Sequence, residues 1–279
     1  MKSYAAVAFL VVVWGLAYPL TKLLSQFFSP PFIAFFRALV GFLMLYAAAR
    51  GLRPGLRTAI VGILSMGATV LSLSIATAIS RNPGLVSALM YTQPIFVLAI
   101  GAALGARPKP LETLGVALGV SGVVLSAWGG LSLDVALPLI GGFLWALGSI
   151  LYGRWLASED PMPVTAAMNG YAALFLAPAA ALDFRIDPTP ISLALLIALA
   201  VAAQGLGWLL YFVSIRELGV AKVSEMVLLT PVSSYLFSYA IFHAVPTETQ
   251  LAGSALILLG VFLTYLAKPR PARPREATR

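Results

Sequence analysis

Long apolar runs of about 20 residues, the length that crosses a bilayer as a helix, fill most of this 279-residue chain. Hydrophobic residues make up 60% of the sequence and charged residues only 10%, and the mean hydropathy is +0.95. Lipid accepts only helices or closed barrels, because it offers the backbone no hydrogen bonds. The runs lack the alternation of polar and apolar residues that marks barrel strands. The sequence therefore predicts an all-α integral membrane protein.

Breaks at proline, glycine and charge clusters divide the chain into ten expected transmembrane spans. They cover residues 4–24, 31–50, 58–79, 84–106, 111–128, 135–155, 161–182, 191–215, 221–243 and 249–267. The first run has no small-residue cleavage site before Lys22, so we expect a span there and not a signal peptide. The expected connections are too short to hold a soluble domain.

Lysine and arginine fall mostly in one set of connections, and this bias predicts orientation. Of the 18 such residues, only Lys22, Arg81 and Arg185 fall on the poorer side, while Arg37 lies inside a span. Both termini are therefore expected in the cytoplasm, with the protein in the inner (plasma) membrane. Anionic lipid explains the net charge of +8, so no nucleic-acid partner is expected. Residues 269–279 are expected to form a basic, disordered tail.

The two halves of the sequence repeat a pattern. The block Val86-Ser87 with Pro94 recurs as Val223-Ser224 with Pro231. Further pairs at nearly the same offset are Trp14 with Trp145, Pro31 with Pro163, Arg37 with Asn169, Gly115 with Gly253 and Gly122 with Gly260. Five spans are an odd number, so a second copy enters the membrane with the opposite polarity. The sequence predicts two inverted five-helix repeats, residues 1–130 and 131–268, with the substrate site between them.

Loose motifs along essentially the whole chain resemble a known family. They are the run Trp14-Gly15 with Lys22, the spacing of Pro31 and Arg37, and the Pro94 and Pro231 segments that each lead into a glycine-rich helix. In these features the sequence is similar to the ten-helix drug/metabolite transporter superfamily, in particular to EamA-type exporters, and within these to broad-range exporters of aromatic and other amino acids. The resemblance implies a bundle that functions as a monomer around a central cavity, with helices five and ten as scaffold.

The sequence departs from this family at one place. Many members carry a glutamate near the ends of helices four and nine, where this chain has Arg107 and Ala244. Any role of that glutamate therefore does not carry over to this chain.

Polar and aromatic side chains at mid-membrane depth must face a cavity or another helix. Several recur at helical spacing on one face, and we predict that they line a substrate cavity. The candidates are Trp14, Tyr18, Ser65, Thr69, Ser72, Ser87, Tyr91, Trp145, Ser149, Gln204 and Trp208. Glu225 is kept as a further candidate, although Lys222 is a nearer partner for it.

Each of these residues also has a simpler interpretation. Tryptophan and tyrosine often form interfacial belts, which suits Tyr152, Trp155 and Tyr211, and membrane serine and threonine often bond to backbone. Pro94 and Pro231 each free a carbonyl one turn earlier, which fits a static kink or a hinge. We predict hinges, because the placement matches in both halves. Arg37 is expected to snorkel to the outer surface.

The residue types limit function. No basic cluster at mid-depth would hold phosphates, and no buried carboxylate other than the shallow Glu225 would hold a cationic drug. Neutral and aromatic amino acids are therefore the expected substrates, with drugs or other metabolites as the alternative. The sequence lacks a phosphate loop, cysteine and metal-binding clusters, so no cofactor or metal is expected. Both a facilitator and a weakly proton-linked carrier remain open. An integral membrane enzyme would need clustered acids or histidines, and Glu159-Asp160 is an isolated pair.

Overall fold

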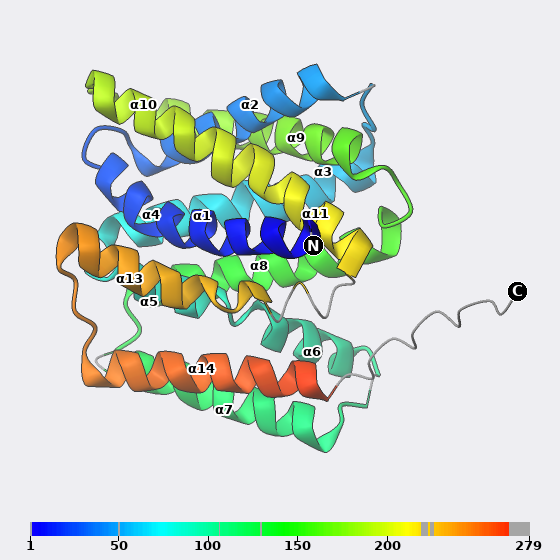
Figure 1. The fold of residues 1–279 in the computed structure, drawn as a ribbon, viewed down its shortest axis with the longest axis vertical. Helices are drawn as coiled ribbons and strands as arrows, with labels where there is room; N and C mark the ends of the chain where they lie inside the picture. Colours follow the sequence, from blue (N-terminus) through cyan, green and yellow to red (C-terminus); the bar gives the residue numbers. More distant parts are fainter. Residues whose placement is uncertain are drawn as a thin grey trace, which may run out of the picture.

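The structure is a computed structural model that describes residues 2–49, 51–105, 107–128, 130–218, 223 and 226–267. The regular structure of these residues is helical, apart from one isolated bridge between Phe28 and Ile186 (Figure 1). The prediction of an all-α protein is thus confirmed for the described residues. Ser224, Glu225 and the basic tail lie outside them.

The helices follow one another as antiparallel rods across the bundle. They are α1 (Lys2–Leu24), α2 (Pro30–Ala48), α3 (Leu56–Gly62), η1 (Ile63–Ala68), α4 (Thr69–Ile79), α5 (Pro83–Met90), α6 (Gln93–Ala103), α7 (Pro110–Ser126), α8 (Leu133–Trp155), α9 (Pro161–Leu182), α10 (Pro190–Leu199), η2 (Ala200–Leu206), α11 (Gly207–Leu218), α13 (Thr230–Phe242) and α14 (Glu248–Leu266). The elements α3, η1 and α4 run on continuously, as do α10, η2 and α11.

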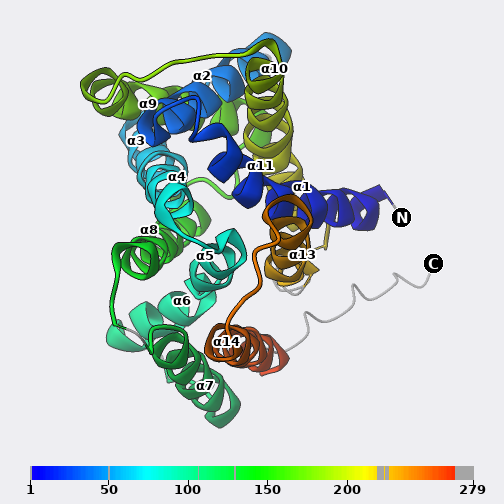
Figure 2. The same ribbon diagram turned by 90° about the vertical axis from the view of Figure 1, so that its left-hand side faces the viewer.

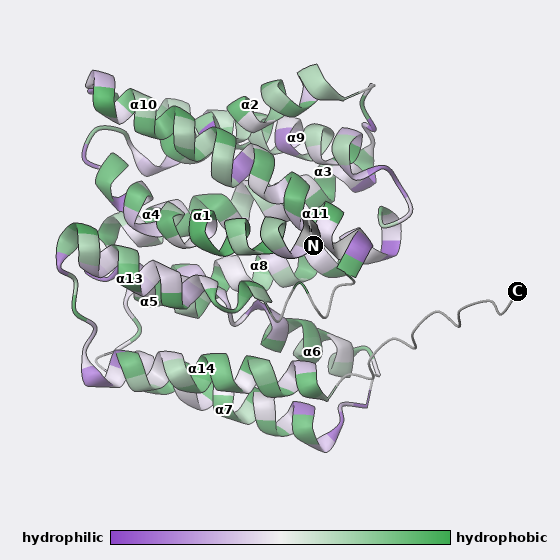
Figure 3. Ribbon diagram, in the orientation of Figure 1, coloured by the Kyte–Doolittle hydropathy of each residue, from purple (hydrophilic) through white to green (hydrophobic). Residues whose placement is uncertain are grey.

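Eight of the described helical stretches are long and apolar enough to cross a membrane, and α7 is a shorter apolar helix. Hydrophobic residues cover the lengths of the helices, and hydrophilic residues gather mainly at their ends (Figure 3). A bundle with this distribution is a multi-pass membrane protein, because only a lipid environment matches its apolar sides.

Proline sets where many of these helices begin. It is the first residue of α2, α5, α7, α9 and α10, at Pro30, Pro83, Pro110, Pro161 and Pro190. The first turn of a helix has no internal partner for its N–H groups, so a proline there costs no hydrogen bond and its fixed φ already suits the helix. The expected spans therefore begin within a few residues of the observed helices.

The helix is interrupted just before Pro94. Within the expected span 84–106, the structure ends α5 at Met90 and starts α6 at Gln93, with Pro94 in the first turn of α6. Pro231 likewise lies in the first turn of α13. A proline ring clashes with a continuing helix and disfavours helical geometry in the residue before it, so the helix restarts instead of bending.

The helices α7 and α14 pack so closely that only glycine fits between them. A Cβ added at Gly115 would lie 2.5 Å from the carbonyl oxygen of Gly260, and one at Gly122 would lie 2.5 Å from that of Gly253. Small residues allow such close backbone approach in membrane helices. The pair forms one edge of the molecule, apart from the helices that surround the centre (Figure 2).

The connections divide between two ends of the bundle. Those joining α2 to α3, α6 to α7 and α8 to α9 lie at one end, here called the basic end because it carries Arg53, Arg57 and Lys109 (Figure 1). Those joining α1 to α2, α9 to α10 and α13 to α14 lie at the opposite end (Figure 1). The helix α1 therefore runs from the basic end to the opposite end.

Candidate substrate cavity

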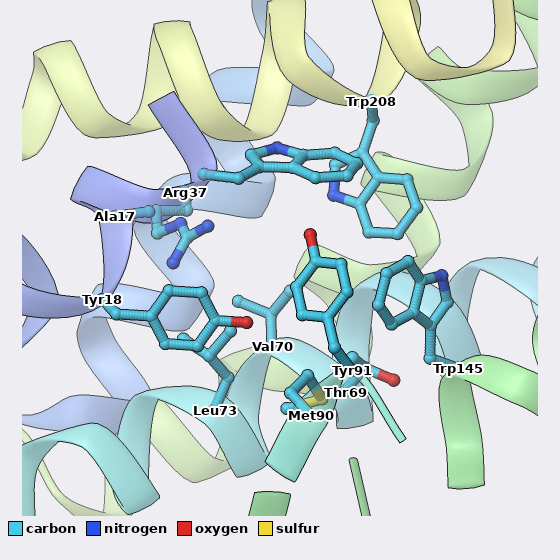
Figure 4. A pocket seen from close by; sticks show the side chains of 11 residues that line it. Ala17, Tyr18, Arg37, Thr69, Val70, Leu73, Met90, Tyr91, Trp145 and Trp208 are labelled. Atoms are coloured by element: carbon cyan, nitrogen blue, oxygen red, sulfur yellow. The ribbon is translucent and has the colours of Figure 1, made fainter. Parts of the chain in front are cut away.

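A cavity of about 50 Å³ lies in the middle of the bundle (Figure 4). Its walls come from α1, α2, α4, α5, α8 and α11, and so from both halves of the sequence. The lining residues are Trp14, Ala17, Tyr18, Arg37, Thr69, Val70, Leu73, Met90, Tyr91, Trp145 and Trp208. The structure thus brings together six of the predicted residues: Trp14, Tyr18, Thr69, Tyr91, Trp145 and Trp208.

Three tryptophans meet on one side of the cavity, each from a different helix. The ring centroids of Trp14 and Trp208 are 5.4 Å apart, those of Trp145 and Trp208 are 6.1 Å apart, and those of Trp14 and Trp145 are 6.4 Å apart. Tyr91 meets the Trp145 ring edge-on at 5.6 Å, and Tyr211 lies 5.4 Å from Trp14. Tilted and edge-on arrangements at these distances stabilise aromatic pairs beyond simple burial. The result is a continuous aromatic wall.

A hydrogen bond fixes the central ring of this wall. The indole N–H of Trp14 donates to the carbonyl oxygen of Ala203, 3.0 Å away. Ala203 lies in η2, where hydrogen bonds span five residues: the Gly207 N–H donates to the Ala202 oxygen. A π segment loosens the helical ladder and allows a side chain to bond with its carbonyls. The orientation of Trp14 therefore depends on η2.

The first half has a similar arrangement in η1. The backbone N–H and the hydroxyl of Thr69 both donate to the carbonyl oxygen of Leu64, five residues earlier. The same hydroxyl lies 3.3 Å from the carbonyl oxygen of Gly141 on α8. The π segments η1 and η2 thus each lie beside a cavity residue.

Arg37 lies in the cavity wall, which corrects the prediction that it snorkels to the surface. Its side chain is buried, with 4% exposed, and its Nε and Nη1 atoms have no hydrogen-bond partner among the described residues. Position in the sequence indicated depth in the membrane but not which face of α2 would carry the residue. Packing of α2 against α4 and α9 turns this face inward.

A second cavity of about 120 Å³ begins behind the tryptophans and extends towards the basic end as far as Gly153 and Ala157. Trp145 and Trp208 line both cavities, so their side chains stand between the two. The predicted residues Ser65 and Ser149 line this second cavity.

Three predicted residues lie outside both cavity walls. Ser72 and Ser87 are buried between helices. Gln204 is also fully buried, and its amide donates to the Asn169 side-chain oxygen on α9, 2.9 Å away. Glu225 is not among the described residues.

Sequence reasoning missed the role of Arg37 in the cavity, although two signals pointed to it. It is a charge inside an expected span, and such charges usually face a cavity. It also matches the buried Asn169 in the internal repeat.

The opposite end of the bundle is held closed by contacts between connections. The guanidinium of Arg185 donates to the carbonyl oxygens of Ser25 and Gln26, at 2.7 and 3.0 Å. The Lys22 ammonium donates to the carbonyl oxygen of Ser80, which ties the end of α1 to the end of α4. At the basic end, Arg53 and Glu159 approach to 3.5 Å with exposed side chains, and the Lys109 ammonium donates to the carbonyl oxygen of Ala267, 2.7 Å away.

The fold and the cavity define a class of protein: a multi-pass membrane protein with a small aromatic cavity between the two halves of its chain. The model of the EamA-like transporter family matches residues 1–128 and 133–266. The chain belongs to this family and is a membrane transporter, not an enzyme.

Relatives agree with this assignment. An uncharacterized transporter of Bacillus subtilis (strain 168), YvbV, is 26% identical over 277 residues, which cover 94% of this chain and 91% of the relative. A "Probable amino-acid metabolite efflux pump" of Salmonella typhimurium (strain LT2) is 26% identical over 280 residues and covers 91% of each chain. A solved crystal structure superposes with a TM-score of 0.65 at 22% identity, over 95% of this chain and 97% of the other. That likeness concerns the fold alone.

Proposed function

We propose that this protein is a secondary transporter that exports neutral and aromatic amino acids across the inner (plasma) membrane by alternating access. The observation that carries the proposal is the cavity itself. It lies between the ends of the spans and is walled by Trp14, Trp145, Trp208 and Tyr91, and among its described lining residues Arg37 alone is charged. An aromatic wall with few polar groups suits a small molecule with an apolar body.

The proposed architecture is ten spans in two inverted repeats, residues 1–130 and 131–268, with both termini in the cytoplasm. Three observations support it. The family matches the chain in two segments, and π segments recur as η1 and η2 in the middle of the third and the eighth expected spans. Gly115 contacts Gly260 while Gly122 contacts Gly253, so each half contributes equivalent glycines to the α7–α14 contact.

Amino acids are the preferred substrate class. A sugar phosphate would require several lysines or arginines around its phosphates, and of the described residues that line the cavity only Arg37 is basic. The Salmonella relative is named as an amino-acid metabolite efflux pump, which agrees with this class.

Alternating access accounts for the size of the cavity. Ligand pockets usually measure about 300–1,000 Å³, and this one measures about 50 Å³. Substrate can therefore enter only when the aromatic side chains and their helices separate. We propose that Trp145 and Trp208 part towards the basic end, where the second cavity lies, and that the helix restarts at Pro94 and Pro231 act as hinges.

Counterflow in liposomes tests the proposed function. Purified protein preloaded with unlabelled phenylalanine should accumulate labelled phenylalanine, tryptophan and leucine. Trp208→Ala should lower this flux about tenfold, the effect of losing one buried aromatic contact surface, while the amount of folded protein is unchanged. Transport of dyes or sugar phosphates but of no amino acid would contradict the proposal. Repeating the assay with a pH gradient distinguishes a facilitator from a proton-linked carrier.

A further inference from the structure

Arg37 presents a buried positive charge to the central cavity, and the described residues leave part of its guanidinium without a hydrogen-bond partner. Its side chain is 4% exposed, it lines the cavity, and two of its nitrogens lack hydrogen-bond partners among the described residues. Figure 4 shows the guanidinium extending from α2 towards Tyr18 and the cavity. The aromatic wall does not neutralise it, because none of the other described lining residues carries a carboxylate.

A buried guanidinium without a partner lowers the stability of the fold unless a ligand binds to it. A guanidinium remains charged in proteins, and a charge taken from water without a partner destabilises the fold. Charges inside membrane proteins usually pair or mark a substrate pathway. Arg53 and Glu159 form an ion pair at the basic end, where both side chains are exposed to solvent, whereas Arg37 is buried. Among the described residues, the Nε and Nη1 atoms of Arg37 are therefore free to bind an anion that enters the cavity.

We propose that Arg37 binds the carboxylate group of the transported molecule, with the apolar body of that molecule lying among Trp14, Trp145, Trp208 and Tyr91. This rests on the proposed function and narrows it. The flat fork of donors of a guanidinium matches the two oxygens of a carboxylate. One lining charge fits one negative charge, so monocarboxylates are preferred over dianions and phosphates.

The proposal also says which part of an amino acid is recognised. The described part of the cavity wall offers a cation for the carboxylate but no carboxylate for the ammonium group. Recognition should therefore require the acid and tolerate loss of the amine. An amino acid amide carries a positive charge and no carboxylate, so Arg37 should repel it.

Ligand binding to the full-length protein in detergent tests this prediction. Two of the five tryptophans separate the cavities, so intrinsic tryptophan fluorescence reports occupancy. The probes are phenylalanine, 3-phenylpropionate and phenylalaninamide, which share one ring and differ in charge. Wild-type protein should bind both acids at least about tenfold more tightly than the amide, as expected for losing a charged hydrogen bond.

Variants assign the preference to Arg37. Arg37→Gln should remove the preference for acids, and Arg37→Lys should retain part of it, because an ammonium keeps the charge without the fork. Arg81→Gln is the matched control: it removes an exposed arginine from the α4–α5 connection and should bind like the wild type. Without ligand, Arg37→Gln should melt no lower than the wild type, because it removes an unpaired buried charge.

Several results would overturn the proposal. These are equal binding of acid and amide by the wild type, an undiminished preference in Arg37→Gln, or no binding of either acid at millimolar concentration. If Arg37→Gln does not fold, Arg37→Lys decides: restored stability without any preference for acids would show a structural role only. Failure of the proposed function can be distinguished from failure of the Arg37 proposal. If acids bind through Arg37 but no amino acid is transported, amino acid export alone is refuted. If phenylalanine and its amide are transported equally well, the role of Arg37 alone is refuted.

Discussion

At the scale of single residues, the cavity depends on a few polar contacts within an apolar interior. Trp14 is held by its bond to the Ala203 carbonyl, and Gln204 by its bond to Asn169. Both bonds involve η2 and lie where water cannot replace a lost partner. Trp14 lines the cavity, whereas Gln204 joins η2 to α9.

Trp14→Phe tests the hydrogen bond to Ala203, because it keeps an aromatic ring and removes the indole donor. We expect the free energy of unfolding to fall by about 1 kcal/mol, the usual value of one hydrogen bond. The measurement is a thermal or denaturant melt of purified protein. Trp128→Phe is the control, since Trp128 is 74% exposed and should give no change. Equal melting of all three proteins would show that the Ala203 bond contributes nothing.

At the scale of elements, helix ends and helix contacts are determined by proline and glycine. Proline starts helices at their unpaired N–H groups, and glycine allows α7 and α14 to touch. Proline and glycine thus have different proposed roles. The helix restarts at Pro94 and Pro231 are proposed to move, whereas the glycine contact holds α7 and α14 together as a scaffold.

Gly115→Ala tests the scaffold. The added Cβ would lie 2.5 Å from the Gly260 carbonyl oxygen, so the helices must separate, and we expect a loss of about 1–3 kcal/mol of stability. Gly153→Ala, where no atom lies within 4 Å of the new Cβ, should leave stability unchanged or raise it slightly. A melt of both variants against the wild type makes the comparison. A loss of the same size in both would rule out the close contact as its cause.

Pro94→Ala tests the hinge. Without the ring, α5 and α6 can join into one continuous helix, so we expect the maximal transport rate to fall severalfold while the substrate concentration at half-maximal rate changes little. Kinetics in liposomes would measure both quantities. Pro110→Ala, at the start of α7 in the scaffold pair, should leave both unchanged. An unaltered rate in Pro94→Ala would indicate that the restart is static.

At the scale of the whole molecule, the two ends of the bundle differ in charge and in closure. Among the described residues, the basic end carries Arg53, Arg57, Lys109 and Arg154 and holds the second cavity, while Arg185 and Lys22 link connections at the opposite end. We propose that the basic end lies in the cytoplasm, as the positive-inside rule favours, and that the contacts at the opposite end close the outward side.

Cysteine labelling tests this orientation, and the chain helps because it contains no cysteine. Ser158→Cys places a thiol in the α8–α9 connection at the basic end, and Val245→Cys places one at a residue that is 72% exposed at the opposite end. A maleimide that cannot cross membranes should label Val245→Cys in intact cells and Ser158→Cys only after the cells are permeabilised. The reverse pattern would invert the proposed topology.

Much of the fold could be predicted from the sequence, because a membrane restricts the possible structures. Apolar runs must become helices in lipid, and proline marked where many of them begin. The sequence also marked interruptions at Pro94 and Pro231, but it does not show whether a helix bends or restarts there, and both prolines lie in the first turn of a new helix. Their role as hinges stays a prediction.

The sequence by itself determined that this chain is a helical membrane protein with aromatic residues at mid-depth. Only the tertiary structure decided which of those residues meet. It brought Trp14, Trp145 and Trp208 together, turned Arg37 inward and directed Gln204 to Asn169. The reason is physical: residue spacing fixes depth and relative angle along a helix, while the rotation of each helix about its axis follows from packing against neighbours distant in sequence.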